Sequence, residues 1–316
     1  MNKIRTILIG TSEFAERIFE KLREVRLPLV EIIAVITAPD KPVGRKQILT
    51  PSPVKKWALE NNLPVLQPDK IKKPGWVTKI KELNPELIIL CAYGQIIPKE
   101  ILSIPKYSAL NIHPSLLPKY RGASPIQAAI LNGDKETGVS LMIMDEEMDH
   151  GPIISNLKSQ ISNLKLTYDE LSEKLADLSA ELLIKTLPDW IGGKIKPQAQ
   201  DHAKATFCKL IKKEDGKIDW NKSVEEVERQ IRAFCEWPES YTDFNGKILK
   251  IIEADSENKN TEKKPGEVFL DENKNICVQT GNGILILKQI QLEGKKPMTA
   301  KDFLNGHPEI IGASLK

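Results

Sequence analysis

Apolar residues gather in short runs that alternate with helix-like patterns through the first part of the chain. Residues 6–9 form a continuous apolar run, residues 14–25 carry the spacing of an amphipathic helix, and residues 29–36 form a second, mostly apolar run. Strands that are apolar throughout are covered by helices on both faces. This order of strand, helix and strand predicts the start of a doubly wound, mostly parallel, Rossmann-like sheet.

The same alternation continues to about residue 187. Further strands are expected near residue 65 and at 87–93, 109–113, 139–144 and 153–162, with helices at 53–61 and 77–83 and one that opens at Ser124-Pro125. Thr167 and Glu170 have the spacing of a capping box, which marks the start of a long helix. These elements together predict one α/β domain.

A second unit follows a polar, basic stretch at 192–219 that has no sustained periodicity. Ser223 and Glu226 form another capping box before an amphipathic helix, and turn signals such as Asn245-Gly246 then separate short strand-like segments. A small, OB-like β-barrel of about five strands would use these segments without leaving a long edge. We therefore expect an α/β domain over residues 1–203, a linker over 204–219 and a β-barrel domain over 220–316.

The composition is that of a globular protein, because 41% of the 316 residues are hydrophobic and 28% are charged. No apolar run approaches the ~18 residues that cross a bilayer, and the N-terminus has no small-residue cleavage site. We expect a cytoplasmic protein that does not bind membranes. The four cysteines form no C-x-x-C pair, and no histidine stands at metal-ligand spacing from them, so neither a disulfide framework nor a metal site is predicted.

The net charge and the turn after the first strand bear on two classes of partner, nucleic acids and dinucleotides. The net charge of +3 is too mild to indicate a nucleic-acid-binding protein by itself, so any bound RNA must be attracted by local patches. The turn after the first strand contains Gly10 but lacks the second and third glycines of a dinucleotide fingerprint. Glu13 would also place an anion at the phosphate position, and the sequence therefore argues against NAD or FAD.

The most informative segment begins at Asn111 and His113. These residues stand two apart at the end of a predicted buried strand, so both side chains point to the same side of the pleat. Ligands bind at the carboxyl edge of open α/β sheets, where this amide and imidazole would meet. An isolated pair of this kind is more often a capping histidine beside a turn. Here, however, prolines and Arg121-Gly122 fix an irregular loop that could shape a ligand pocket.

The whole segment, NIHPSLLPKYRGASPIQ, resembles the signature of 10-formyltetrahydrofolate-dependent formyltransferases, in which Asn-x-His precedes SLLP-x-x-x-G. Asp149 fits the aspartate that this family carries in a later loop. The resemblance implies that Asn111, His113 and Asp149 are catalytic, that 10-formyltetrahydrofolate is the co-substrate and that no metal takes part. It also implies that the folate lies along Ser115, Leu116, Leu117 and Pro118 and near Ala92, Tyr93 and Gly94.

Other segments resemble the branch of the family that formylates the α-amino group of methionine on initiator tRNA, which serves translation initiation. They are APDKPVGRKQILTPSPVKKWA, IDWNKSVEEVERQIRAFCEWPESYTDFNGK and LEGKKPMTAKDFLNGH, so the resemblance extends over nearly the whole chain. It implies initiator methionyl-tRNA as the partner, bound by Arg45 and Lys46, and we expect a monomer. The barrel would add a second RNA contact if its lysines share a face, namely Lys247, Lys250, Lys288, Lys295 and Lys296.

Two departures from the family pattern affect these expectations. The basic loop is one residue shorter than the common G-R-G-K-K form and leaves Arg45 and Lys46, so which basic side chain reaches the RNA stays open. His150 stands where a small residue usually follows the aspartate, which would change the surroundings of Asp149.

Formyl transfer passes through a tetrahedral carbon that bears an oxyanion, and the three expected catalytic residues suit this chemistry. Asn111 and a protonated His113 would donate to the oxyanion, while Asp149 would keep His113 charged and accept a proton from the attacking ammonium. A formyltransferase that acts on an amino sugar nucleotide would share these residues. A catalytically idle RNA-binding protein built on the same scaffold is the alternative from another class.

Overall fold

The structure, a computed structural model, describes residues 3–25, 29–44, 46–161 and 164–316. The chain divides into two compact units that interleave in sequence. The first comprises Met1–Pro125, Glu136–Gln160 and Ser172–Lys209, and the second comprises Ile126–Lys135, Ile161–Leu171 and Leu210–Lys316. The boundaries expected at residues 203 and 220 stay a proposal, and each unit is described by itself.

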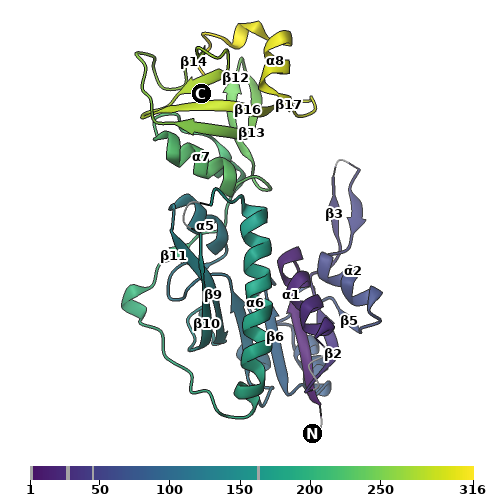
Figure 1. The fold of residues 1–316 in the computed structure, drawn as a ribbon. Coiled ribbons are helices and arrows are strands. Elements are labelled where there is room, and N and C mark those ends of the chain that lie inside the picture. Colours follow the sequence, from purple (N-terminus) through teal and green to yellow (C-terminus); the bar gives the residue numbers. More distant parts are fainter. Residues whose placement is uncertain (1–2, 26–28, 45, 162–163) are drawn as a thin grey trace. The chain divides into compact units, whose positions relative to one another are not determined.

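The first unit is built on a sheet whose described strands follow the order β10-β9-β7-β6-β1-β2-β5 (Figure 1). Parallel pairing joins β1 (Ile4–Gly10), β2 (Val30–Ile36), β5 (Val65–Leu66), β6 (Leu87–Cys91) and β7 (Ala109–His113). In contrast, β9 (Glu136–Ile143) runs antiparallel between β7 and β10 (Ile153–Gln160). The predicted doubly wound, mostly parallel sheet is confirmed.

Helices cover both faces of this sheet. Ile80 of α3 (Pro74–Glu82) and Ile101 of α4 (Lys99–Leu102) pack in one buried cluster with Ile9 and Leu90, on one face. On the other face lie α1 (Glu13–Glu24) and α6 (Tyr168–Ile191), and α2 (Pro53–Glu60) packs against α1 (Figure 1). The expected capping box of α6 is present, since Glu170 accepts from the amide of Thr167. This helix continues to Ile191 although it contains Pro188.

Several short elements were not expected. An antiparallel hairpin of β3 (Lys41–Val43) and β4 (Ile48–Thr50) forms the predicted basic loop. The stretch expected to be a linker contains η1 (His202–Lys204), β11 (Phe207–Cys208) and η2 (Lys213–Gly216). Of these, β11 pairs in parallel with β8 (Arg121–Gly122), which belongs to the loop after β7. Such two- or three-residue pairings leave no hydrophobic period in the sequence.

The second unit contains a curled antiparallel sheet, or half-barrel, and the helix α7 (Val224–Ala233). It also contains α5 (Pro125–Leu131), except for the first residue of that helix. Its described strands are β12 (Ser240–Phe244), β13 (Lys247–Glu257), β16 (Ile284–Leu292), β15 (Ile276–Gln279) and β14 (Val268–Leu270), in this order across the sheet. The short strand β17 (Met298–Thr299) pairs antiparallel with Gln289 and Ile290 of β16. It is followed by α8 (Ala300–Gly306) and η3 (Pro308–Ile310).

A tight turn between β12 and β13 and hydrogen bonds from the last residues of the chain hold this sheet in its curled form. Asn245 and Gly246 both have positive φ angles, 53° and 77°, as a two-residue turn between antiparallel strands requires. The final residues bond to both edge strands, because the amide of Asp243 in β12 donates to Lys316 and that of Val268 in β14 donates to Ala313. The expected small barrel is thus nearly closed by an irregular segment.

Arg232 ties α7 to the loop that precedes α6 within this second unit. Its guanidinium bonds to Glu228 at 2.7 and 2.9 Å and to the carbonyl of Leu166 at 2.7 Å, and the Glu228 side chain is 8% exposed. Replacing Arg232 by Ala leaves a buried carboxylate without its cation. We expect the free energy of unfolding of this unit to fall by about 3 kcal/mol, measured by urea denaturation. Lys288→Ala, which removes a more exposed ion pair with Asp255 in the same unit, should change it little.

Candidate functional site

Asn111 and His113 lie on β7, in the middle and at the end of the strand. Both residues are buried, with 7% and 4% of their surface exposed, although each is polar. They share a face with Ala109, which packs in the cluster of α3 and α4, because residues two apart on a strand point the same way. The site therefore lies on this face of the sheet, as the spacing of the two residues predicted.

Asp149 reaches the pair from the loop after β9. Since β9 runs antiparallel to β7, its last residue, Ile143, lies beside Leu110, at the other end of β7 from His113. The loop then folds back over the strand, and the amide of Ile143 closes it on the carbonyl of Pro152 at 2.9 Å. Asp149 itself has a φ of +50°, in the left-handed region that is unfavourable for side chains other than glycine.

The carboxylate of Asp149 is held by three groups. Its Oδ1 accepts from Nδ2 of Asn111 at 3.1 Å and lies 3.5 Å from Nδ1 of His113. Its Oδ2 accepts from the backbone amide of Gly122 at 2.8 Å. The side chain is 12% exposed and that of His113 only 5%, so these interactions are poorly screened by water. The structure thus brings Asn111, His113 and Asp149 together in one cluster.

The protonation of His113 is constrained by Tyr120. Nε2 of the ring lies 2.9 Å from the Tyr120 carbonyl, and because a carbonyl only accepts, Nε2 carries a hydrogen. Nδ1 faces Asp149, 3.5 Å from its Oδ1. Both ring nitrogens therefore face protein groups. Asn111 still has a second Nδ2 hydrogen, since only one bond of this amide group to Asp149 is formed.

Gly122 is a position at which only glycine fits. Its φ is +118°, and a Cβ there would lie 2.2 Å from the carbonyl oxygen of Cys208. This close approach follows from the pairing of β8 with β11, and it aims the Gly122 amide at Asp149. Sequence reasoning missed this contact of Asp149, because a backbone donor has no residue-type signal.

The residues expected to line the folate differ in exposure. Ala92 and Gly94 are exposed after β6, and Leu116 and Pro118 are half-buried. Ser115 and Leu117 are buried, and the Ser115 hydroxyl donates to the carbonyl of Lys119 at 2.6 Å. The ring of Tyr93 packs in the cluster of α3 and α4, and burial raises the pKa of its hydroxyl to about 12. Of this set, only the exposed and half-buried residues offer accessible surface to a ligand.

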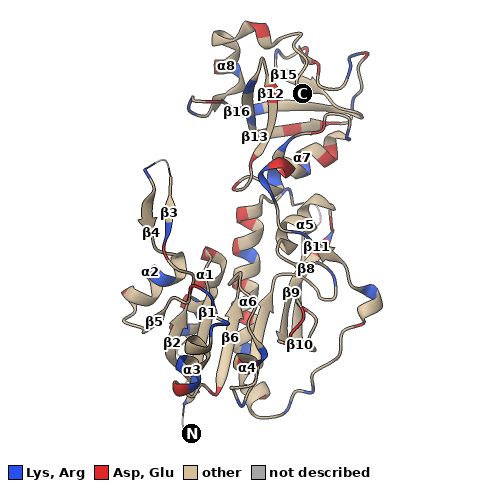
Figure 2. Cartoon of the chain, turned by 180° about the vertical axis from the view of Figure 1, so that it is seen from behind, with Lys and Arg blue, Asp and Glu red and all other residues tan. Residues whose placement is uncertain are grey.

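The expected RNA contacts are only partly described. Arg45 lies outside the described residues, whereas Lys46 is exposed in the turn between β3 and β4. Figure 2 shows acidic and basic residues interspersed over the second unit. In the half-barrel, Lys250 pairs with Glu239 and Lys288 pairs with Asp255 at 3.0 Å, so carboxylates neutralise both lysines. The other three of the five expected lysines are exposed near one end of the β13–β16 pair, namely Lys247, Lys295 and Lys296.

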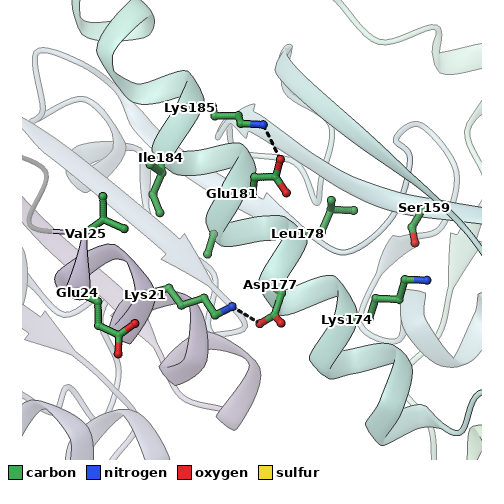
Figure 3. A pocket seen from close by; sticks show the side chains of 11 residues that line it. Lys21, Glu24, Val25, Ser159, Lys174, Asp177, Leu178, Glu181, Ile184 and Lys185 are labelled. Atoms are coloured by element: carbon green, nitrogen blue, oxygen red, sulfur yellow. Dashed lines mark hydrogen bonds and ion pairs between the residues drawn. The ribbon is translucent and has the colours of Figure 1, made fainter.

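A separate pocket of about 560 Å³ lies between α1 and α6 (Figure 3), on the sheet face opposite to Asn111. Its charged side chains pair with one another, for example Lys21 with Asp177 at 2.7 Å. No residue predicted as functional lines it. Across the described ranges, no cluster of His, Cys, Asp and Glu could hold a metal ion. Nor is any helix there long and apolar enough to span a membrane.

Comparison with known proteins gives two matching family profiles. The profile described as "Formyl transferase" matches residues 2–187, and "Formyl transferase, C-terminal domain" matches residues 210–308. A methionyl-tRNA formyltransferase from Sulfurihydrogenibium sp. (strain YO3AOP1) is 42% identical over 310 residues, which cover 96% of this chain and 97% of the relative. One from Caldicellulosiruptor saccharolyticus is 44% identical over 306 residues, covering 95% and 96%.

Solved structures with a similar fold cover most of the chain. An N-formyltransferase from Helicobacter canadensis, in complex with folinic acid and dTDP-3-aminofucose, has a TM-score of 0.65 at 22% identity and covers 90% of this chain and 99% of its own. HypX from Aquifex aeolicus, in complex with tetrahydrofolic acid, has a TM-score of 0.64 at 18% identity, covering 98% and 48%. At these identities the likeness concerns the fold alone.

Proposed function

The chain belongs to the formyl transferase family, and from that membership we propose that it transfers the formyl group of 10-formyltetrahydrofolate to the α-amino group of methionyl initiator tRNA. The product is N-formylmethionyl-tRNA, which serves translation initiation in the cytoplasm, and we expect the enzyme to act as a monomer. The observation that carries the proposal is the convergence of Asn111, His113 and the Gly122 amide on the carboxylate of Asp149. The identity of the acceptor rests on the full-length relatives.

The reaction needs a free amine and an acceptor for its proton. Asp149 is the nearest carboxylate to Asn111 and His113, and it takes one proton from the ammonium, directly or through a water molecule. The amine nitrogen then forms a bond to the formyl carbon, and the bond from that carbon to N10 of the folate breaks. N10 receives the second proton of the amine, so one proton is released overall. No covalent intermediate with the protein is required.

The oxyanion formed on the way is stabilised by Asn111 and by charge. The second Nδ2 hydrogen of Asn111 is the donor that this geometry offers directly. When its ring is protonated, His113 adds a positive charge beside the site, 3.5 Å from Oδ1 of Asp149. Since Nε2 is bonded to Tyr120, the part of His113 in this arrangement is electrostatic rather than that of a direct donor. Folate would lie against Ala92, Gly94, Leu116 and Pro118.

The function is tested by incubating the protein with 10-formyltetrahydrofolate and charged initiator tRNA, followed by detection of formylmethionine. A parallel reaction offers dTDP-3-aminofucose, the amino sugar nucleotide bound in the Helicobacter canadensis structure. We expect formylation of the tRNA alone. Formylation of the sugar alone would favour a formyltransferase that acts on amino sugar nucleotides. Activity with neither acceptor would favour an RNA-binding protein without catalytic activity.

Lys46 is the described residue through which the hairpin contact with tRNA can be tested. Lys46→Ala should lower kcat/KM for tRNA while folate binding stays unchanged, because a phosphate contact is lost far from the folate residues. The slope of log affinity against log salt should fall by roughly one unit or somewhat less. Salt titrations of tRNA binding measure this, with exposed Lys81 of α3 replaced by Ala as the control. An unchanged slope would mean that Lys46 does not reach the RNA backbone.

A further inference from the structure

Gln200 has no part in the reaction described above, yet it is buried beside Asp149. Its side chain is 6% exposed, and Nε2 donates to the backbone carbonyls of Asp149 at 2.8 Å and Gly151 at 2.7 Å. Its Oε1 accepts from Nε and Nη2 of Arg121, at 3.1 and 2.7 Å. Both hydrogens of the amide and both lone pairs of its oxygen are therefore used.

Asp149 needs support of this kind because of its backbone conformation. Its φ of +50° is left-handed, and a residue with a side chain keeps such a conformation only where the surroundings fix it. The two hydrogen bonds from Gln200 hold the carbonyls of Asp149 and Gly151, on either side of His150. They fix the backbone from which the carboxylate extends toward Asn111 and Gly122.

Arg121 and a pair of histidines hold Gln200 and the loop in place. Arg121 is 4% exposed, and its Nη2 also lies 2.9 Å from Nδ1 of His202, which must accept because a guanidinium only donates. The His202 ring stacks on that of His150, with centroids 4.1 Å apart and planes at 7°. His150 in turn contacts Asp145 at 2.7 Å. His150, which departs from the family pattern, thus belongs to the support of the loop.

We propose that Gln200 is a positioning residue, which aims the carboxylate of Asp149 through the backbone of residues 149–151. The inference rests on the proposed function, in which Asp149 accepts the proton of the amine. Gln200 contacts no reacting atom in this scheme, so its effect on the rate passes entirely through Asp149. A displacement of about 1 Å at a reacting group is enough to cost on the order of 10²-fold in rate.

The test compares Gln200→Met, which removes every hydrogen bond of the amide, with Gln200→Glu, which keeps an acceptor for Arg121 but loses the donor to the loop. Both should lower kcat by about 10- to 100-fold while KM for folate and tRNA changes little. Gln198→Met is the matched control, since that side chain is exposed and only its backbone pairs with Ile153. It should retain the wild-type kcat.

Hydrogen exchange supplies a second measurement that does not depend on activity. The Gly122 amide donates to Asp149, so it should exchange faster in both Gln200 variants than in Gln198→Met, while amides of β1 and β6 keep their rates. A wild-type kcat in both Gln200 variants, or an unchanged Gly122 amide, would overturn the inference. If Gln200→Met does not fold, Gln200→Glu decides. If the wild-type chain fails to formylate tRNA, the proposed function fails while the exchange measurement still tests the positioning.

Discussion

Asp149→Asn is expected to lower the turnover of formyl transfer by about 10²- to 10⁴-fold, the range typical of losing a general base. The amide has nearly the shape of the carboxylate but cannot take a proton from the amine. It also places an N–H group where the structure has acceptors for Asn111 and for the Gly122 amide. Steady-state kinetics should show the loss in kcat, and binding of a folate analogue should stay close to that of the wild type.

The control for this change lies in the same loop. Glu146 has a side chain that is 61% exposed and pairs with Lys99, so Glu146→Gln removes one negative charge near the site without touching Asn111, Gly122 or His150. It should leave kcat unchanged. If Asp149→Asn kept more than about a tenth of the wild-type turnover, a general-base part for this carboxylate would be untenable.

Asn111→Ala is expected to cost about 10²- to 10³-fold in kcat, the usual result of removing one oxyanion donor. The same change removes the 3.1 Å bond to Asp149, so the double variant with Asp149→Asn should be far less impaired than the product of the two single effects. Asn156→Ala, exposed on the edge strand β10, which β9 separates from β7, is the control. Independent, multiplying effects would mean that the two side chains do not act as a unit.

The sequence predicted the central strands well, because strands such as 87–91 are apolar throughout and buried on both faces. It did not predict that β9 runs antiparallel, since an apolar run carries no sign of strand direction. That direction decides how Asp149 reaches Asn111, over the face of the sheet and not from an adjacent strand end. The catalytic roles of these residues stay a prediction.

The contacts around Asn111, His113 and Asp149 were harder to predict from the sequence. Gln200 and Cys208 lie in a polar stretch without periodicity, where nothing indicates that one supports a loop and the other packs on Gly122. The barrel lysines show a different limit, because a sequence gives the charged residues but not the ion pairs that they form. Lys250 and Lys288 each add a positive charge, but the fold places Glu239 and Asp255 beside them.

The interleaving of the two units limits how chimaeras of this family can be built. A crossover at residue 209 would join the half-barrel of one protein to residues 126–135 and 161–171 of another, although these segments belong to the same unit as the half-barrel. The contacts of Arg232 with the carbonyl of Leu166 and of Arg229 with the turn at Gly133 would then join segments from two different proteins. A functional exchange of the second unit between relatives therefore has to transplant three separate pieces of chain together.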